Sequence, residues 1–217
     1  MRPAYDLIVF DWDGTLFDSV GWIVDCIQRA ALASDRAVPS EQAARSVIGL
    51  SLQQAMAALY PGSNEVEMQR FVAHYRTLYH APPGASLQVF AGVSELLTAL
   101  RAQGYKLGLA TGKARSGLEH ALQATGMGGY FDATRCADET ASKPHPRMLH
   151  ELLEQLSVPR RRALLVGDSL HDLRMARNAG VDAVAVSCGA NTPEELAELA
   201  PLACLECPSA LYSFLNG

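Results

Sequence analysis

Hydrophobic residues along this chain follow two different spacing patterns. An unbroken apolar run over residues 7–10 ends directly in Asp11 and Asp13. A run this short, bounded by polar residues, is typical of a strand buried on both faces. From residue 20 to residue 79 the apolar positions instead recur every three or four residues, which indicates a series of amphipathic helices. We find no convincing strand between residues 16 and 83, so this segment is predicted to be all-helical.

Beyond residue 87 the chain alternates between strand patterns and helix patterns. Such alternation predicts an α/β fold, a Rossmann-like parallel sheet with right-handed crossovers and helices on both faces. We therefore expect a core domain of residues 1–15 and 84–217, interrupted by an all-helical domain of residues 16–83. The strands expected after the insert are 105–110, 131–136, 163–166 and 182–187.

Polar residues that could take part in catalysis or bind a ligand lie where these strands end. Asp11 and Asp13 follow the first strand and should project to the same side, Thr111 ends the second, and Asp168 ends a later one. Lys143 lies on a loop that leads from a strand into a helix. Ligands of parallel sheets bind outside the carboxyl ends of the strands, so we expect these side chains to meet at one edge. Each also has a purely structural interpretation, as a turn residue, a helix N-cap or an exposed loop lysine.

Composition narrows the functional classes. The net charge of −5 over 217 residues gives no basic face for nucleic acid, and no apolar segment is long enough to span a membrane. The first strand begins within a few residues of the N-terminus, which leaves no room for a signal peptide, so we expect a cytoplasmic protein. Cys204 and Cys207 form an isolated C-x-x-C pair, a weak zinc signal that we interpret as structural.

The residues expected at this edge predict a site for a metal ion. Three carboxylates, a lysine and a hydroxyl suit a hard cation with oxygen ligands, and Mg²⁺ fits best because it accepts both carboxylate and substrate phosphate oxygens. The sequence contains no G-x-x-x-x-G-K-[ST] loop, no G-x-G-x-x-G after the first strand and no H-E-x-x-H. Nucleotide-binding loops and zinc-protease chemistry are therefore not indicated.

Four motifs occur in order along the chain. They are Asp11-x-Asp13-Gly-Thr-Leu, Thr111-Gly-Lys113, Lys143-Pro-His-Pro146 and Gly167-Asp168-Ser-x-x-Asp172. Together they closely resemble the haloacid dehalogenase-like hydrolase superfamily, over nearly the whole chain. The helical segment between the first two motifs resembles the cap domain of the phosphoglycolate phosphatase-like branch.

The resemblance implies roles for the carboxylates. Asp11 would be the nucleophile that attacks phosphorus and forms an aspartyl-phosphate, and Asp13 would be the general acid and then the general base. Mg²⁺ would be held by the Asp11 carboxylate, the Asp13 backbone carbonyl and Asp168.

The resemblance also implies partners for the phosphoryl group. Thr111 and the Gly112 amide would hold its oxygens, Lys143 would offset the charge of phosphate and nucleophile, and Asp172 would steer Lys143 or a metal-bound water. In the cap, Arg45 and the turn at Gly49 are the candidates to contact the rest of the substrate, although Arg45 could equally be a solvated helix charge.

These roles predict a magnesium-dependent phosphatase for a small phosphomonoester, with 2-phosphoglycolate as the first choice. The expected partner is a small phosphorylated metabolite, and the protein is expected to be a monomer or homodimer. A phosphomutase of the beta-phosphoglucomutase type shares every core motif and stays open, as does a non-catalytic binding module on the same fold. A dehalogenase is disfavoured, because in that branch the position of Asp13 is not aspartate.

Overall fold

The computed structural model describes residues 4–81 and 88–217. The expected domain boundary between residues 83 and 84 lies outside these residues. Within them, one six-stranded sheet has the order β5-β4-β1-β6-β7-β8, and all its neighbouring strands pair in parallel. The predicted α/β fold is thereby confirmed. The strands are β1 (Leu7–Phe10), β4 (Lys106–Thr111), β5 (Ala133–Cys136), β6 (Ala163–Gly167), β7 (Asp182–Val186) and β8 (Cys204–Leu205).

Strand β1 lies inside the sheet, between β4 and β6. Its four residues are all buried, and they alternate between the two faces as an extended chain requires. Ile8 and Phe10 belong to one apolar cluster, and Leu7 and Val9 belong to another on the opposite face. This explains why the strand reads as a continuous apolar run: both of its faces are covered.

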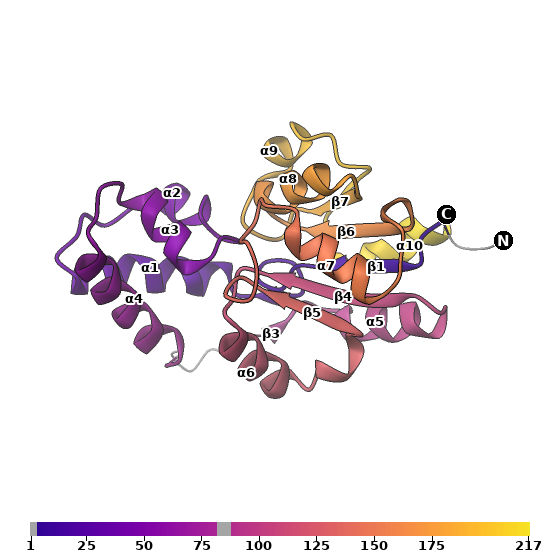
Figure 1. Cartoon of the computed structure of the whole chain (residues 1–217), viewed down its shortest axis with the longest axis horizontal. Coiled ribbons are helices and arrows are strands. Elements are labelled where there is room, and N and C mark those ends of the chain that lie inside the picture. Colours follow the sequence, from indigo (N-terminus) through magenta and orange to yellow (C-terminus); the bar gives the residue numbers. More distant parts are fainter. Residues whose placement is uncertain (1–3, 82–87) are drawn as a thin grey trace.

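Helices cover both faces of the sheet (Figure 1). The cluster with Ile8 and Phe10 receives apolar side chains from α5, α6 and α10, whereas the cluster with Leu7 and Val9 receives them from α7 and α8. These helices are α5 (Val93–Ala102), α6 (Arg115–Thr125), α7 (Arg147–Gln155), α8 (Leu170–Ala179) and α10 (Leu211–Asn216), with α9 (Pro193–Ala197) and the short 3₁₀ turns η1 (Gly128–Tyr130), η2 (Arg160–Arg162) and η3 (Pro208–Ala210) in the connections.

Four helices follow β1 and lie to one side of the sheet, on the left in Figure 1. They pack around an apolar cluster that is separate from the two clusters of the sheet and includes Ile23, Ile27, Met56 and Phe71. We call them the cap helices: α1 (Val20–Ala33), α2 (Glu41–Arg45), α3 (Leu52–Leu59) and α4 (Glu65–Tyr79). Among the described residues, none of the helices has the length and apolar character that a membrane crossing requires.

The expectation that residues 16–83 contain no strand is wrong at one place. Phe17–Asp18 forms β2, which pairs antiparallel with β3 (Gln88–Val89) in a separate two-stranded sheet. The pair ties together the stretch of chain that enters the cap helices and the stretch that follows them. Two-residue strands have no detectable hydrophobic period, so neither β2 and β3 nor the equally short edge strand β8 could be predicted from the pattern.

Candidate active site

Asp11 and Asp13 emerge from the carboxyl end of β1. The Asp11 amide donates to the Val166 carbonyl at 3.0 Å, so the residue is still fixed by the sheet ladder. Both aspartates are buried, with exposed fractions of 1% and 8%, and both line the same cavity. Trp12, between them, is buried in an apolar cluster of the sheet and stacks on Phe17 with ring centroids 5.5 Å apart. The alternation predicted for this stretch therefore separates the apolar side chain from the two carboxylates.

Lys143 lies between two carboxylates beside the end of β1. Its Nζ is 2.8 Å from Asp11 Oδ1 and 2.6 Å from Asp172 Oδ1, and the side chain is fully buried. Burial alone would lower the pKa of Lys143, but the adjacent carboxylates of Asp11 and Asp172 outweigh it and raise that pKa. Lys143 is therefore a permanently charged counter-ion of Asp11.

Asp172 holds Lys143 and also lies in the first turn of helix α8. Its Oδ2 accepts hydrogen bonds from the amide and the hydroxyl of Ser169, at 3.3 and 2.6 Å, as part of a capping box. Its Oδ1 faces Lys143. Ser169 is therefore the N-cap of α8, and the same cap orients a carboxylate toward Lys143.

Asp168, at the end of β6, joins Asp11 and Asp172 in a carboxylate cluster whose oxygens lie within 4.8 Å of one another. Asp168 Oδ1 accepts from the Thr15 hydroxyl at 2.6 Å, and Oδ2 accepts from the Ala190 amide at 2.7 Å. Burial, together with the charge of Asp172, raises the pKa of Asp168 to about 7. Burial raises the pKa of Asp11 well above its ordinary value in spite of Lys143. Carboxylates that resist ionisation in this way favour a bound cation.

The donor set fits a divalent metal ion. Asp11 Oδ2 is buried and has no hydrogen-bond partner among the described residues, so one oxygen of the cluster is free to bind a cation. Two glycines closely border the cluster: a Cβ on Gly14 or Gly189 would lie only 2.2 or 2.1 Å from Asp168 Oδ2. Buried carboxylate oxygens at close quarters are the ligands that Mg²⁺ prefers. Asp11 and Asp168 would hold the ion, whereas the carboxylate of Asp13 lies outside this cluster.

Thr111 and Gly112 lie where β4 ends and meet the cap helices. Thr111 is fully buried, and its hydroxyl accepts from the Lys113 amide at 3.2 Å. A Cβ on Gly112 would lie 2.6 Å from the Gly49 carbonyl oxygen and 2.5 Å from that of Leu50. Only glycine therefore fits beneath this turn, and Gly49, with φ of +96°, supplies the left-handed turn that covers it. The structure brings Gly49 and Gly112, two of the predicted site residues, into direct contact.

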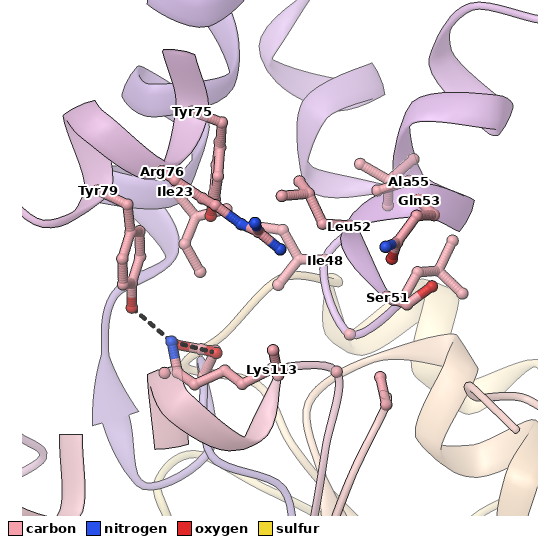
Figure 2. Close-up of a pocket in the computed structure, with 18 of the residues that line it drawn as sticks. Ile23, Ile48, Ser51, Leu52, Gln53, Ala55, Tyr75, Arg76, Tyr79 and Lys113 are labelled. Atoms are coloured by element: carbon pink, nitrogen blue, oxygen red, sulfur yellow. Dashed lines mark hydrogen bonds and ion pairs between the residues drawn. The ribbon is translucent and has the colours of Figure 1, made fainter. Parts of the chain in front are cut away.

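Lys113 and Tyr79 are site residues that sequence reasoning missed. The sequence showed Lys113 only as the last residue of the Thr111-Gly-Lys113 motif. In the structure its Nζ lies 3.1 Å from Asp13 Oδ2 and donates to the Tyr79 hydroxyl at 2.5 Å (Figure 2). The other oxygen of Asp13 accepts from the Ser19 hydroxyl at 2.6 Å. Tyr79 was predicted only as an apolar position of α4. The helical period indicates that it faces inward, but not that it reaches a lysine of the core.

A cavity of about 210 Å³ lies between the cap helices and the strand ends. Asp11, Asp13, Gly112 and Lys113 line its core side. Its volume is below the roughly 300–1,000 Å³ of sites for drug-sized ligands, so it suits a small molecule. On the cap side the lining is largely apolar and comprises Ile23, Ile27, Val47, Ile48, Leu50, Leu52, Ala55 and Tyr75 with Gly49, Ser51, Gln53, Arg76, Tyr79 and His80.

The expectation for Arg45 does not match its place in the structure. Arg45 is absent from the cavity lining, and its guanidinium donates to Glu41 Oε1 at 2.9 Å and to the Gly189 carbonyl at 3.2 Å. Arg76 of α4 lines the cavity instead, and Figure 2 shows its side chain extending between Tyr79 and Leu52. Among the described residues no side-chain hydrogen bond or ion pair engages Arg76, so its charge is available to a ligand.

Comparisons with known proteins agree with this geometry. The sequence model of a family described as haloacid dehalogenase-like hydrolase matches residues 8–186. The chain is 35% identical over 207 residues to the probable phosphatase IndB of Dickeya dadantii, covering 93% of this chain and 88% of that protein. It is 32% identical over 223 residues to a phosphoglycolate phosphatase of Rhodospirillum rubrum, covering 96% and 90%. The crystal structure of a hydrolase from Pseudomonas syringae shares the fold, with a TM-score of 0.89, 22% identity and coverage of 97% and 98%.

Proposed function

Since this chain belongs to the haloacid dehalogenase-like hydrolases, in its phosphoglycolate phosphatase-like branch, and is a phosphatase of that family, we propose that it is a magnesium-dependent enzyme that hydrolyses a small phosphomonoester through an aspartyl-phosphate on Asp11. The observation that carries the proposal is the pairing of Asp11 with the buried Lys143 at 2.8 Å, at the inner end of a cavity that also contains Asp13.

The proposed reaction has two displacements at phosphorus. In the first, a carboxylate oxygen of Asp11 forms a bond to phosphorus, the ester P–O bond breaks, and Asp13 gives its proton to the departing oxygen. In the second, Asp13 takes a proton from water while the water oxygen bonds to phosphorus, and the bond between phosphorus and Asp11 breaks. Phosphate is released, and both aspartates return to their starting states. In-line positioning matters most for such transfers, and β1 supplies it by fixing Asp11 in the sheet.

Charge neutralisation is shared between the chain and a metal ion. Bound by Asp11 and Asp168, Mg²⁺ would supply Lewis-acid stabilisation of the phosphoryl oxygens. Lys143 offsets the charge of Asp11 as the dianionic phosphate approaches, and Asp172 keeps its Nζ in place. Thr111 and the amide of Gly112 lie at the same strand end and would bind phosphoryl oxygens.

The preferred substrate is a molecule of the size of 2-phosphoglycolate. The small cavity supports a short leaving group, and Arg76 gives it a cation for a carboxylate, the role first expected of Arg45. A phosphoglycolate phosphatase among the relatives points the same way. We further propose that the protein acts in the cytoplasm as a monomer or homodimer. The free state of all five cysteines is consistent with a reducing compartment.

The test is release of inorganic phosphate from 2-phosphoglycolate, measured with Mg²⁺ and with EDTA. We expect turnover that requires Mg²⁺ and that Asp11→Asn abolishes, while Asp25→Asn, which changes an exposed carboxylate of α1, leaves it intact. Free phosphate as the product distinguishes hydrolysis from a phosphomutase reaction, which would yield an isomerised phosphate ester. Substantial Mg²⁺-dependent activity in Asp11→Asn would overturn the covalent mechanism.

A further inference from the structure

Among the residues that the structure describes, Lys113 is the one cation of the cavity lining that contacts the acid–base carboxylate. We propose that Lys113, held by Tyr79, is a positioning residue for Asp13: it fixes the carboxyl group toward the leaving oxygen and stabilises the carboxylate left when the proton has been transferred. This inference rests on the proposed function, since it assigns a partner to the acid–base group of that reaction.

The orientation of Asp13 is set at both of its oxygens. Oδ1 accepts from the Ser19 hydroxyl at 2.6 Å, and Oδ2 forms an ion pair with Lys113 Nζ at 3.1 Å. A carboxyl group restrained on both sides cannot rotate freely about its terminal bond. Positioning of this kind matters because a proton-transfer group must lie within hydrogen-bond reach of the atom it protonates.

Lys113 is in turn fixed by the cap helices. Its side chain is about 10% exposed, and besides Asp13 its ammonium group has the Tyr79 hydroxyl at 2.5 Å (Figure 2). The Tyr79 ring stacks on Tyr75, one turn earlier in α4, with centroids 5.7 Å apart. The ammonium group is thus held from the side of α4 and directed at Asp13 from the side of the core. A flexible lysine gains a defined position in this way.

The charge of Lys113 matches the course of the first displacement. When the ester P–O bond breaks and the proton moves from Asp13 to the leaving oxygen, a negative charge appears on Asp13. An ammonium group 3.1 Å away stabilises that charge strongly, because both side chains are only about one-tenth exposed. The benefit exists only if the leaving oxygen needs a proton. Lys113 should therefore matter for alkyl phosphates, and much less for aryl phosphates whose leaving group departs as a stable anion.

The experiment compares kcat/KM for an alkyl phosphate and for para-nitrophenyl phosphate, because kcat/KM reports the steps up to departure of the leaving group. We expect Lys113→Met to lower kcat/KM for the alkyl substrate about 100-fold, at the low end of general acid effects, and to change the value for para-nitrophenyl phosphate by less than about 5-fold. Asp13→Asn should show the same selectivity more strongly. Tyr79→Phe, which keeps the ring and every charge, should show it more weakly.

Lys106→Met is the matched control, because Lys106 lies at the opposite end of the same strand, where its Nζ donates to the Leu156 carbonyl. Lys106→Met should leave kcat/KM unchanged for both substrates. Equal losses on both substrates in Lys113→Met, with Asp13→Asn selective, would overturn the inference while leaving the proposed function standing. A wild-type protein without Mg²⁺-dependent turnover would refute the proposed function itself. If Lys113→Met does not fold, the selectivity of Tyr79→Phe decides, and its absence counts against the inference.

Discussion

Replacing Asp168 by asparagine should stabilise the metal-free protein. Asp168 is completely buried, and burial with the neighbouring Asp172 raises its pKa from the ordinary value of 3.8 to about 7. The folded protein therefore binds this proton more strongly than the unfolded chain does. Because the unfolded state carries fewer protons between these two pKa values, stability falls as pH rises from about 4 to about 7 and stays low above it.

The size of the effect follows from the same shift. At about 1.4 kcal/mol per pH unit, the ionised carboxylate costs the metal-free fold about 4 kcal/mol at pH 8. Asparagine has the same shape and no charge: its oxygen can accept from the Ala190 amide, while its NH₂ must donate to the Thr15 hydroxyl, which would have to rotate. Allowing for that adjustment, Asp168→Asn should be about 2–4 kcal/mol more stable at pH 8, a rise in Tm of about 4–16 °C for a chain of this length.

Thermal unfolding followed by circular dichroism tests this expectation in EDTA at pH 8 and at pH 5. The difference should shrink at pH 5, where the carboxyl group of wild-type Asp168 is protonated. Mg²⁺ at 1,000 times its Kd should reverse the order, because it stabilises the wild type by about 4.1 kcal/mol, which exceeds the advantage of a variant that has lost a ligand. An Asp168→Asn protein less stable than the wild type in EDTA at pH 8 would refute the reasoning.

Three further substitutions test other parts of the site. Lys143→Met should abolish phosphate release and lower the free energy of unfolding by about 3–5 kcal/mol in urea titrations, because it leaves buried carboxylates without their cation; unchanged stability would contradict this. Gly112→Ala should lower kcat/KM at least about 10-fold as the turn above it is displaced, whereas Gly129→Ala, at an exposed glycine away from the cavity whose added Cβ would meet no atom within 4 Å, should not; equal effects would show that the contact is irrelevant. Arg76→Ala should raise KM for 2-phosphoglycolate about 10-fold or more and spare alkyl phosphates that have no carboxylate, while Arg45→Ala should leave both unchanged; the opposite pattern in initial-rate kinetics would return the role to Arg45.

The core of the site could be predicted because its residues follow strands with a strong hydrophobic signal. Parallel strands bring their carboxyl ends to one edge, and the structure places Asp11, Thr111 and Asp168 at the ends of β1, β4 and β6. Lys143 could be placed at this edge because its loop leads from a strand into a helix, but a loop lysine has no period that fixes the direction of its side chain. Its complete burial between Asp11 and Asp172 is visible in the coordinates alone.

The cap side of the site could not be predicted, because it depends on how helices lie against the core. Arg45 and Arg76 both occupy amphipathic helices, and their spacing does not show which one reaches the cavity. The structure shows that Arg45 contacts the Gly189 loop, while Arg76 lines the cavity. The Lys113–Tyr79 contact joins residues 34 positions apart across that boundary. The strand pair β2–β3 could not be predicted for a different reason: each strand has two residues, which is too short to show a hydrophobic alternation.

The inner position of β1 governs when a newly made chain can become an enzyme. Leu7–Phe10 leaves the ribosome long before one of its two neighbours, β6, which begins only at Ala163. Until that later segment has emerged, one side of β1 keeps its amide and carbonyl groups unpaired and its apolar residues partly uncovered, a state prone to association with other chains. Translation products that stop short of β6 therefore contain Asp11 without one of the two strands that flank β1, and protection by chaperones matters most during this interval.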